Sequence, residues 1–177
     1  MKARYVVDTN VLIAASAADP THPKDIDATP QDPALRMQVW QWLHDFEQSE
    51  SRLVLDEAQK IYEEYLDSRW LGFNDFGLQV VMHKWSTSAV DYVPVDYDAH
   101  GHALLPDTLS GVVHDTADRK MVAAALASHT LYGEGCVAFA GDTDWHDWEA
   151  TLAGHHVLLE PIIEAWSRQK HAEKQRR

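Results

Sequence analysis

Short apolar runs that alternate with helical patterns constrain the fold of this chain more than any other feature. Runs typical of buried parallel strands lie at Arg4–Val7, Arg52–Leu55, Val90–Val95, Cys136–Ala140 and His156–Leu159. Amphipathic patterns predict helices at Asn10–Ala17, Pro33–Gln48, Asp56–Arg69, Asn74–Ser86, Thr116–His129, Asp144–Ala153 and Pro161–Ala172. This alternation predicts an α/β fold, a three-layer α/β/α sandwich with a central, mainly parallel sheet of about five strands.

The chain shows no internal repeat and no linker that would divide it. Its 177 residues and 45% hydrophobic content suit one globular domain over residues 1–177, which ends in a basic tail, residues 167–177. Two long segments, Ala18–Asp32 and Asp96–His114, have loop composition. Loops of this length either shape a site or are insertions, and the sequence leaves both readings open.

Charge is distributed unevenly along the chain. The tail holds five of the fifteen Lys and Arg residues, which leaves ten bases against 27 acids, a formal charge of −17, in the rest of the chain. An acidic body argues against a broad surface for phosphate groups. Local basic groups, the tail or metal ions would have to hold any nucleic acid. The tail itself is either a solvated helix end or a binding arm.

A single cysteine, Cys136, rules out an intrachain disulfide and a cysteine-based zinc site. The chain enters its first strand without the regions of a signal peptide, and no apolar stretch approaches the roughly 18 residues that a membrane span needs. We therefore expect a soluble, cytoplasmic protein with no membrane partner.

Acidic residues occupy positions that meet at one edge of the predicted sheet. Ligands of open parallel sheets bind beyond the carboxyl ends of the strands. Asp8 ends the first strand, and the segment FAGDTDW places Asp142 and Asp144 after the fourth. Asp118 begins the inward stripe of the preceding helix. The helix after the second strand contributes Glu63 and Glu64, and both lie off its apolar stripe.

Each acid also has an ordinary structural explanation. Asp8 or Asp115 would cap a helix, Asp142 and Asp144 would sit in a turn, and Glu63 and Glu64 would face solvent. The whole set is harder to explain in that way. Two carboxylates ~4 Å apart repel by about 4 kcal/mol at an effective dielectric near 20, so converging acids need raised pKa values or a cation. Carboxylate oxygens suit Mg²⁺ or Mn²⁺ better than zinc.

Four segments of the chain, VVDTNVLIAA, LVLDEAQKIYEEY, DTADRKMVAAALA and VAFAGDTDW, resemble the motifs of the PIN-domain nuclease family, including its VapC-type relatives. The resemblance implies a PIN-like sandwich and RNA cleavage with Mg²⁺ or Mn²⁺. It assigns catalysis and metal binding to Asp8, Glu64, Asp118 and Asp142, with Asp144 as an additional metal ligand. The acid that precedes an apolar residue in EEY selects Glu64 over Glu63.

These features together predict a metal-dependent endoribonuclease that hydrolyses the phosphodiester bonds of RNA. The alternative is a catalytically silent PIN-like module that binds RNA or a protein partner, including an antitoxin-like partner in a toxin–antitoxin pair. A homodimer is a further expectation, because seven tryptophans leave room for an apolar interface although most should be core. A DxD phosphatase is excluded because Asn10 stands at the second acid position. His100 and His102 are expected to be exposed loop residues.

Overall fold

Five strands form one parallel sheet in the order β3-β2-β1-β4-β5. The computed structural model describes residues 1–19, 26–67, 69 and 71–176. The strands are β1 (Arg4–Val7), β2 (Arg52–Asp56), β3 (Val90–Val93), β4 (Gly135–Phe139) and β5 (Val157–Pro161). Within the described residues all four pairings between these strands are parallel, which confirms the predicted, mainly parallel sheet.

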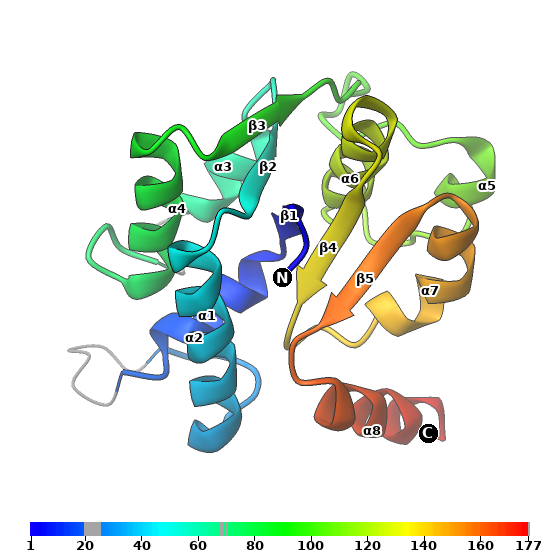
Figure 1. The fold of residues 1–177 in the computed structure, drawn as a ribbon. Coiled ribbons are helices and arrows are strands. Elements are labelled where there is room, and N and C mark those ends of the chain that lie inside the picture. Colours follow the sequence, from blue (N-terminus) through cyan, green and yellow to red (C-terminus); the bar gives the residue numbers. More distant parts are fainter. Residues whose placement is uncertain (20–25, 68, 70, 177) are drawn as a thin grey trace.

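Helices cover both faces of the sheet, as the sequence predicts (Figure 1). The helices are α1 (Thr9–Ser16), α2 (Pro33–Gln48), α3 (Lys60–Tyr65), α4 (Phe76–Ser86), α5 (Asp107–Ser110), α6 (Arg119–Tyr132), α7 (Trp145–Gly154) and α8 (Glu164–Gln175). The helices α1, α2 and α4 pack against one another on one face, whereas α6 crosses the other face and contacts every strand. The architecture is therefore a three-layer α/β/α sandwich.

The strands β1 and β4 lie side by side in the centre of the sheet, and their apolar residues are buried. From β1 the chain builds the sheet outward through β2 and β3, and it then returns to add β4 and β5 on the other side of β1. The crevice at the carboxyl ends of β1 and β4 is therefore a topological switch point, the usual ligand site of an open α/β sheet.

The helix predicted at Asp56–Arg69 is shorter in the structure, where α3 spans Lys60–Tyr65. The buried Asp56 carboxylate accepts hydrogen bonds from the backbone N–H groups of Lys60 and Ile61, and from the Tyr97 hydroxyl. Asp56 therefore caps the N-terminus of α3, although a turn separates Asp56 from the first residue of the helix. Ser68, within the predicted range, lies outside the described residues.

Other differences are confined to element ends and loops. The short helix α5 lies within the predicted loop Asp96–His114, and α6 begins at Arg119 instead of Thr116. Of the predicted loop Ala18–Asp32, residues 20–25 lie outside the described residues. Among the described residues no helix combines the length and apolar character that a membrane crossing requires.

The tryptophans are mainly core residues, as predicted. Trp145 and Trp148 are buried. Trp40, Trp42 and Trp166 are partly buried against the core. Trp85 is 52% exposed, and Trp70 lies outside the described residues.

Candidate functional site

The four acids to which the family resemblance assigns catalysis line one cavity of about 380 Å³. Asp8 follows β1, Glu64 comes from α3, Asp118 precedes α6 and Asp142 follows β4. These segments are far apart in the chain, and the switch point of the sheet brings them together. We call this cavity the acidic cavity.

Of the two adjacent glutamates in α3, only Glu64 lines the acidic cavity. Its Oε1 accepts a hydrogen bond from the Thr9 hydroxyl at the start of α1. Glu63 points elsewhere, with a 60% exposed side chain paired to Lys60. The geometry thus separates two residues that helical periodicity left equivalent.

Asp8 both caps a helix and lines the cavity. Its Oδ1 accepts the backbone N–H of Asn10 at 3.1 Å, which caps α1. Its Oδ2 accepts the indole N–H of Trp145 at 3.1 Å. Burial raises the pKa of Asp8 to about 7, and the hydrogen bond from Asn10 partly opposes this effect. The same carboxylate therefore caps α1 and lines the acidic cavity.

Asp118 is the least satisfied acid of the cavity. Within the described residues its Oδ2 is buried without a hydrogen-bond partner, and it makes no side-chain cap for α6. Burial, followed by the charges of Asp8 and Asp142, raises the pKa of Asp118 to about 9. Negative charge is thus unfavourable here unless a cation accompanies it.

One basic side chain reaches into the acid cluster. Lys120 Nζ lies 2.5 Å from Glu64 Oε2 and donates to the Ala117 carbonyl at 2.8 Å. Its side chain is only 13% exposed. The ammonium therefore offsets part of the negative charge, and it does so at Glu64.

Asp144, predicted as an additional ligand, does not line the acidic cavity. Its carboxylate pairs with Lys174 of α8. Its backbone N–H donates to Asp142 Oδ1 at 2.8 Å and thereby orients that carboxylate. A ligand role for the Asp144 side chain stays a prediction that this placement does not favour.

Two further acids line the acidic cavity, Asp27 and Asp115. Asp115 accepts the backbone N–H of Ala117 at 2.8 Å, but α6 begins only at Arg119, so Asp115 caps a turn before the helix. Asp27 lies in an irregular loop without periodicity, and the sequence contains no signal that marks it. Asp27 is the site residue that sequence reasoning missed.

The loop that carries Asp27 is held against the site by two features. Arg36 of α2 donates to the Pro30 carbonyl at 2.6 Å and to the Ala28 carbonyl at 2.7 Å. Gly141, just before Asp142, lets the loop approach closely, because a Cβ there would lie 2.4 Å from the Thr29 carbonyl oxygen. The described part of the predicted loop Ala18–Asp32 therefore shapes the site.

The donor set of the acidic cavity fits a hard divalent cation. Its side chains offer carboxylate oxygens without Cys or His, and the unpaired Asp118 oxygen is one such donor. Among the described residues no three Asp, Glu, His or Cys side chains already form a metal-binding group. Ion binding would therefore require side-chain rotation, including release of Glu64 from Lys120.

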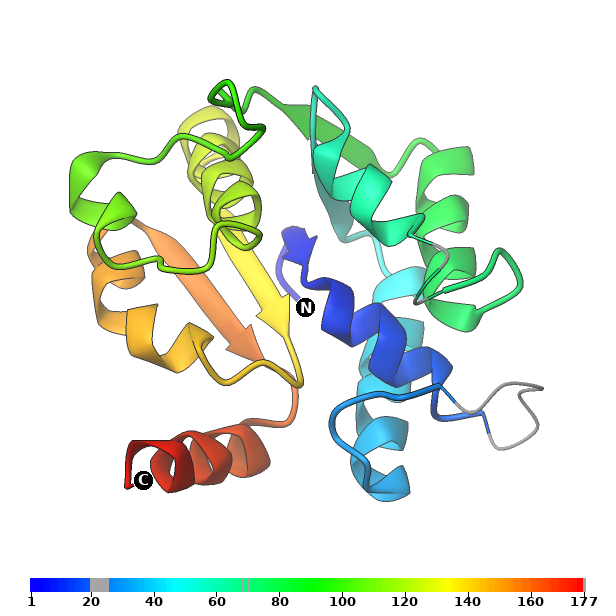
Figure 2. The same ribbon diagram turned by 180° about the vertical axis from the view of Figure 1, so that it is seen from behind.

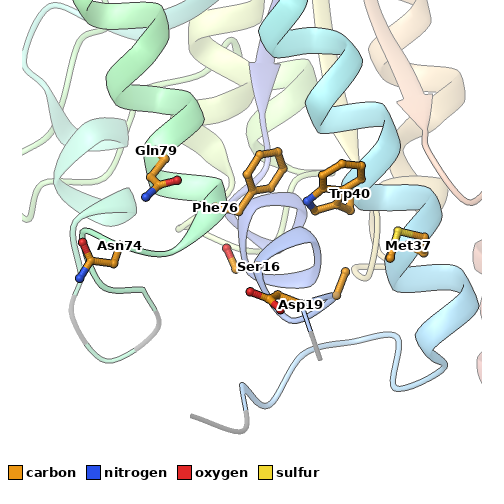
Figure 3. Close-up of a pocket in the computed structure, with 8 residues that line it drawn as sticks. Ser16, Asp19, Met37, Trp40, Asn74, Phe76 and Gln79 are labelled. Carbon is orange, nitrogen blue, oxygen red and sulfur yellow. The ribbon is translucent and has the colours of Figure 1, made fainter. Parts of the chain in front are cut away.

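A second cavity, of about 410 Å³, lies at the opposite end of α1. Phe76 of α4 and Trp40 of α2 flank it above Ser16 (Figure 3). Their rings stack with centroids 5.2 Å apart. Asp19 is the one acid that lines this cavity among the described residues, so it lacks the convergent carboxylates of the acidic cavity.

Comparisons with protein-family models, curated proteins and solved structures find no match to this chain. The chemistry of the acidic cavity therefore rests on the residues themselves.

Proposed function

We propose that this chain is a PIN-like endoribonuclease that depends on Mg²⁺ or Mn²⁺. The observation that carries the proposal is the convergence of Asp8, Glu64, Asp118 and Asp142 on one cavity at the switch point. The buried Asp118 oxygen that has no hydrogen-bond partner among the described residues supports it, since such a group is costly unless a ligand completes it.

The four carboxylates would hold the divalent ion or ions. A divalent ion bound there supplies Lewis acidity, which acidifies water and offsets negative charge on a phosphodiester. The chain's own contribution is to orient the acids. Trp145 and the Asn10 backbone fix Asp8, and the Thr9 hydroxyl holds Glu64. A bound cation also gives an acidic protein a means to attract RNA.

Isothermal titration calorimetry with Mn²⁺ and a cleavage assay on single-stranded RNA test the proposal together. We expect Mn²⁺ binding and Mn²⁺-dependent cleavage by the wild type, and loss of both in Asp118→Asn. Glu64→Gln should lose cleavage by at least about 100-fold, whereas Glu63→Gln, its matched neighbour, should retain it. Wild-type cleavage by Asp118→Asn would refute the assignment.

One observation favours a catalytically silent module instead, namely the Lys120–Glu64 ion pair, which lowers the need for a cation. That alternative predicts RNA or protein binding with no heat from Mn²⁺. We also propose a homodimer and an antitoxin-like partner from the family resemblance, and a cytoplasmic location from the sequence composition. Size-exclusion chromatography with light scattering tests the dimer.

A further inference from the structure

A third cavity, of about 530 Å³, adjoins the acidic cavity. Thr29 lines both cavities, and Gly141 and Thr143 of the third cavity flank Asp142 of the acidic one. Its other lining residues are Pro30, Gln31, Asp32, Trp166 and Lys170. A ligand that fills this cavity would therefore lie next to Asp142 of the acidic cavity.

One face of α8 borders the third cavity with basic and aromatic side chains. Trp166, Lys170 and Lys174 follow one another at intervals of four residues, so they lie on the same side of the helix. Lys174 pairs with Asp144 and interacts electrostatically with Asp142, which places that end of the face beside the acidic cavity. The helix lies beyond the carboxyl ends of β4 and β5 (Figure 2).

The side chains of this cavity are available for a ligand. Trp166 packs one side against the core, and its indole N–H has no hydrogen-bond partner among the described residues. Lys170 is 47% exposed and forms only a surface pair with Glu173, which costs little to break. The carboxylate of Asp32 is already engaged, because it caps α2 through the Ala34 N–H.

An aromatic ring and an exposed lysine next to an acidic centre match the chemistry of a single nucleic-acid strand. Its bases stack on aromatic side chains, and its phosphates pair with lysine. In a duplex the bases are stacked on one another, so their faces are unavailable to Trp166.

We propose that the third cavity is the subsite for single-stranded RNA next to the scissile phosphate, with Trp166 stacking on a base and Lys170 contacting a phosphate. This inference rests on the proposed nuclease function. It deepens that function by naming the form of the substrate and the surface that positions it. Trp166 and Lys170 are binding residues, and the reacting atoms lie in the neighbouring cavity.

Fluorescence anisotropy of a labelled single-stranded RNA oligonucleotide, with EDTA present and at several salt concentrations, tests the subsite without cleavage. Trp166→Leu keeps an apolar side chain but removes the aromatic face. We expect it to weaken binding between about 5-fold and 150-fold with no change in salt dependence. Lys170→Ala should lower the slope of log K against log[salt] by about 0.7, the loss of one phosphate contact.

Matched controls exist on α3 and α4. Lys60 forms an exposed pair with Glu63 at 2.8 Å, like Lys170 with Glu173 at 2.9 Å, so Lys60→Ala should leave the slope unchanged. Trp85 is 52% exposed, and Trp85→Leu should leave affinity unchanged. If Trp166→Leu does not fold, the slope for Lys170→Ala decides alone.

The two proposals fail in different ways. The subsite proposal is wrong if Trp166→Leu and Lys170→Ala bind the RNA with wild-type affinity and wild-type salt dependence. It is also wrong if the wild type binds the annealed duplex as tightly as the single strand. Either result would stand even if Mn²⁺-dependent cleavage is intact. If the wild type shows no Mn²⁺-dependent cleavage, the proposed nuclease function is wrong. In that case a loss of binding in the two variants still assigns the surface to single-stranded RNA.

Discussion

Lys120 and Glu64, which lines the acidic cavity, form an ion pair with 2.5 Å between Nζ and Oε2. Lys120 lies two residues after Asp118, in the first turn of α6, and Glu64 belongs to α3. The pair therefore links two separate elements beside the cavity. It also supplies positive charge at the place where a divalent cation would bind.

Lys120→Met should lower the melting temperature in EDTA. The substitution keeps the apolar stem and leaves Glu64, which is 31% exposed, without its counter-charge. We expect a loss of about 1–2 kcal/mol, and each kcal/mol corresponds to roughly 2–4 °C for a chain of this size. Mn²⁺ should raise the melting temperature of this variant more than that of the wild type. Differential scanning fluorimetry measures both, and an unchanged melting temperature in EDTA would contradict the role of Lys120.

Asp118→Asn should raise the melting temperature in EDTA by several degrees, because the neutral amide replaces a carboxyl group whose negative charge burial and the nearby Asp8 and Asp142 disfavour. It should also abolish the stabilisation by Mn²⁺. Asp8→Asn should raise the melting temperature less. Its new amide N–H₂ group would face the indole N–H of Trp145, and two hydrogen-bond donors cannot pair. Glu63→Gln is the control and should change neither quantity. A lower melting temperature for Asp118→Asn in EDTA would show that its carboxylate is stabilising.

Stability without metal should fall as pH rises from about 4 to about 9. The unfolded chain releases these protons near pH 3.9, whereas burial holds the pKa of Asp8 at about 7 and that of Asp118 at about 9. Between these values the folded state binds more protons than the unfolded state, so rising pH favours unfolding. Below pH 4 both states are protonated, and above pH 9 the loss is complete.

Melting temperatures across this pH range in EDTA test the prediction. The melting temperature should fall less with rising pH in Asp118→Asn than in the wild type. Subtracting one pH profile from the other removes the contribution of the other titrating groups. Excess Mn²⁺ should reduce the fall in the wild type. Parallel pH profiles for the two proteins in EDTA would contradict the raised pKa of Asp118.

Lys84→Met should destabilise the fold without affecting the acidic cavity directly. The buried Lys84 ammonium donates to the carbonyls of Ser49 and Ser51, at 2.9 and 2.8 Å, and lies over the Phe46 ring. Methionine would remove this donor from the two carbonyls, which lie between α2 and β2, at a cost of about 2–4 kcal/mol. Urea denaturation measures the loss, and Lys60→Met serves as a surface control. If Lys84→Met lowers the free energy of unfolding no more than Lys60→Met does, the structural role of Lys84 is contradicted.

Local sequence alone determined the strands and most helices. The boundaries of β1 and α2 agree with the sequence prediction, because apolar periodicity and caps such as Asp32 act within a few residues. The acids that follow β1 and β4 were also predictable, since parallel strands bring their carboxyl ends to one edge.

Tertiary structure decided which side chains meet at that edge. Thr9 and Lys120 select Glu64 over Glu63, and Lys174 draws Asp144 away from the cavity that Asp142 lines. Arg36 holds the loop that carries Asp27. These contacts join residues that are distant in sequence, so helical periodicity does not encode them. The sequence determined which elements form, and long-range packing decided which carboxylates share one cavity.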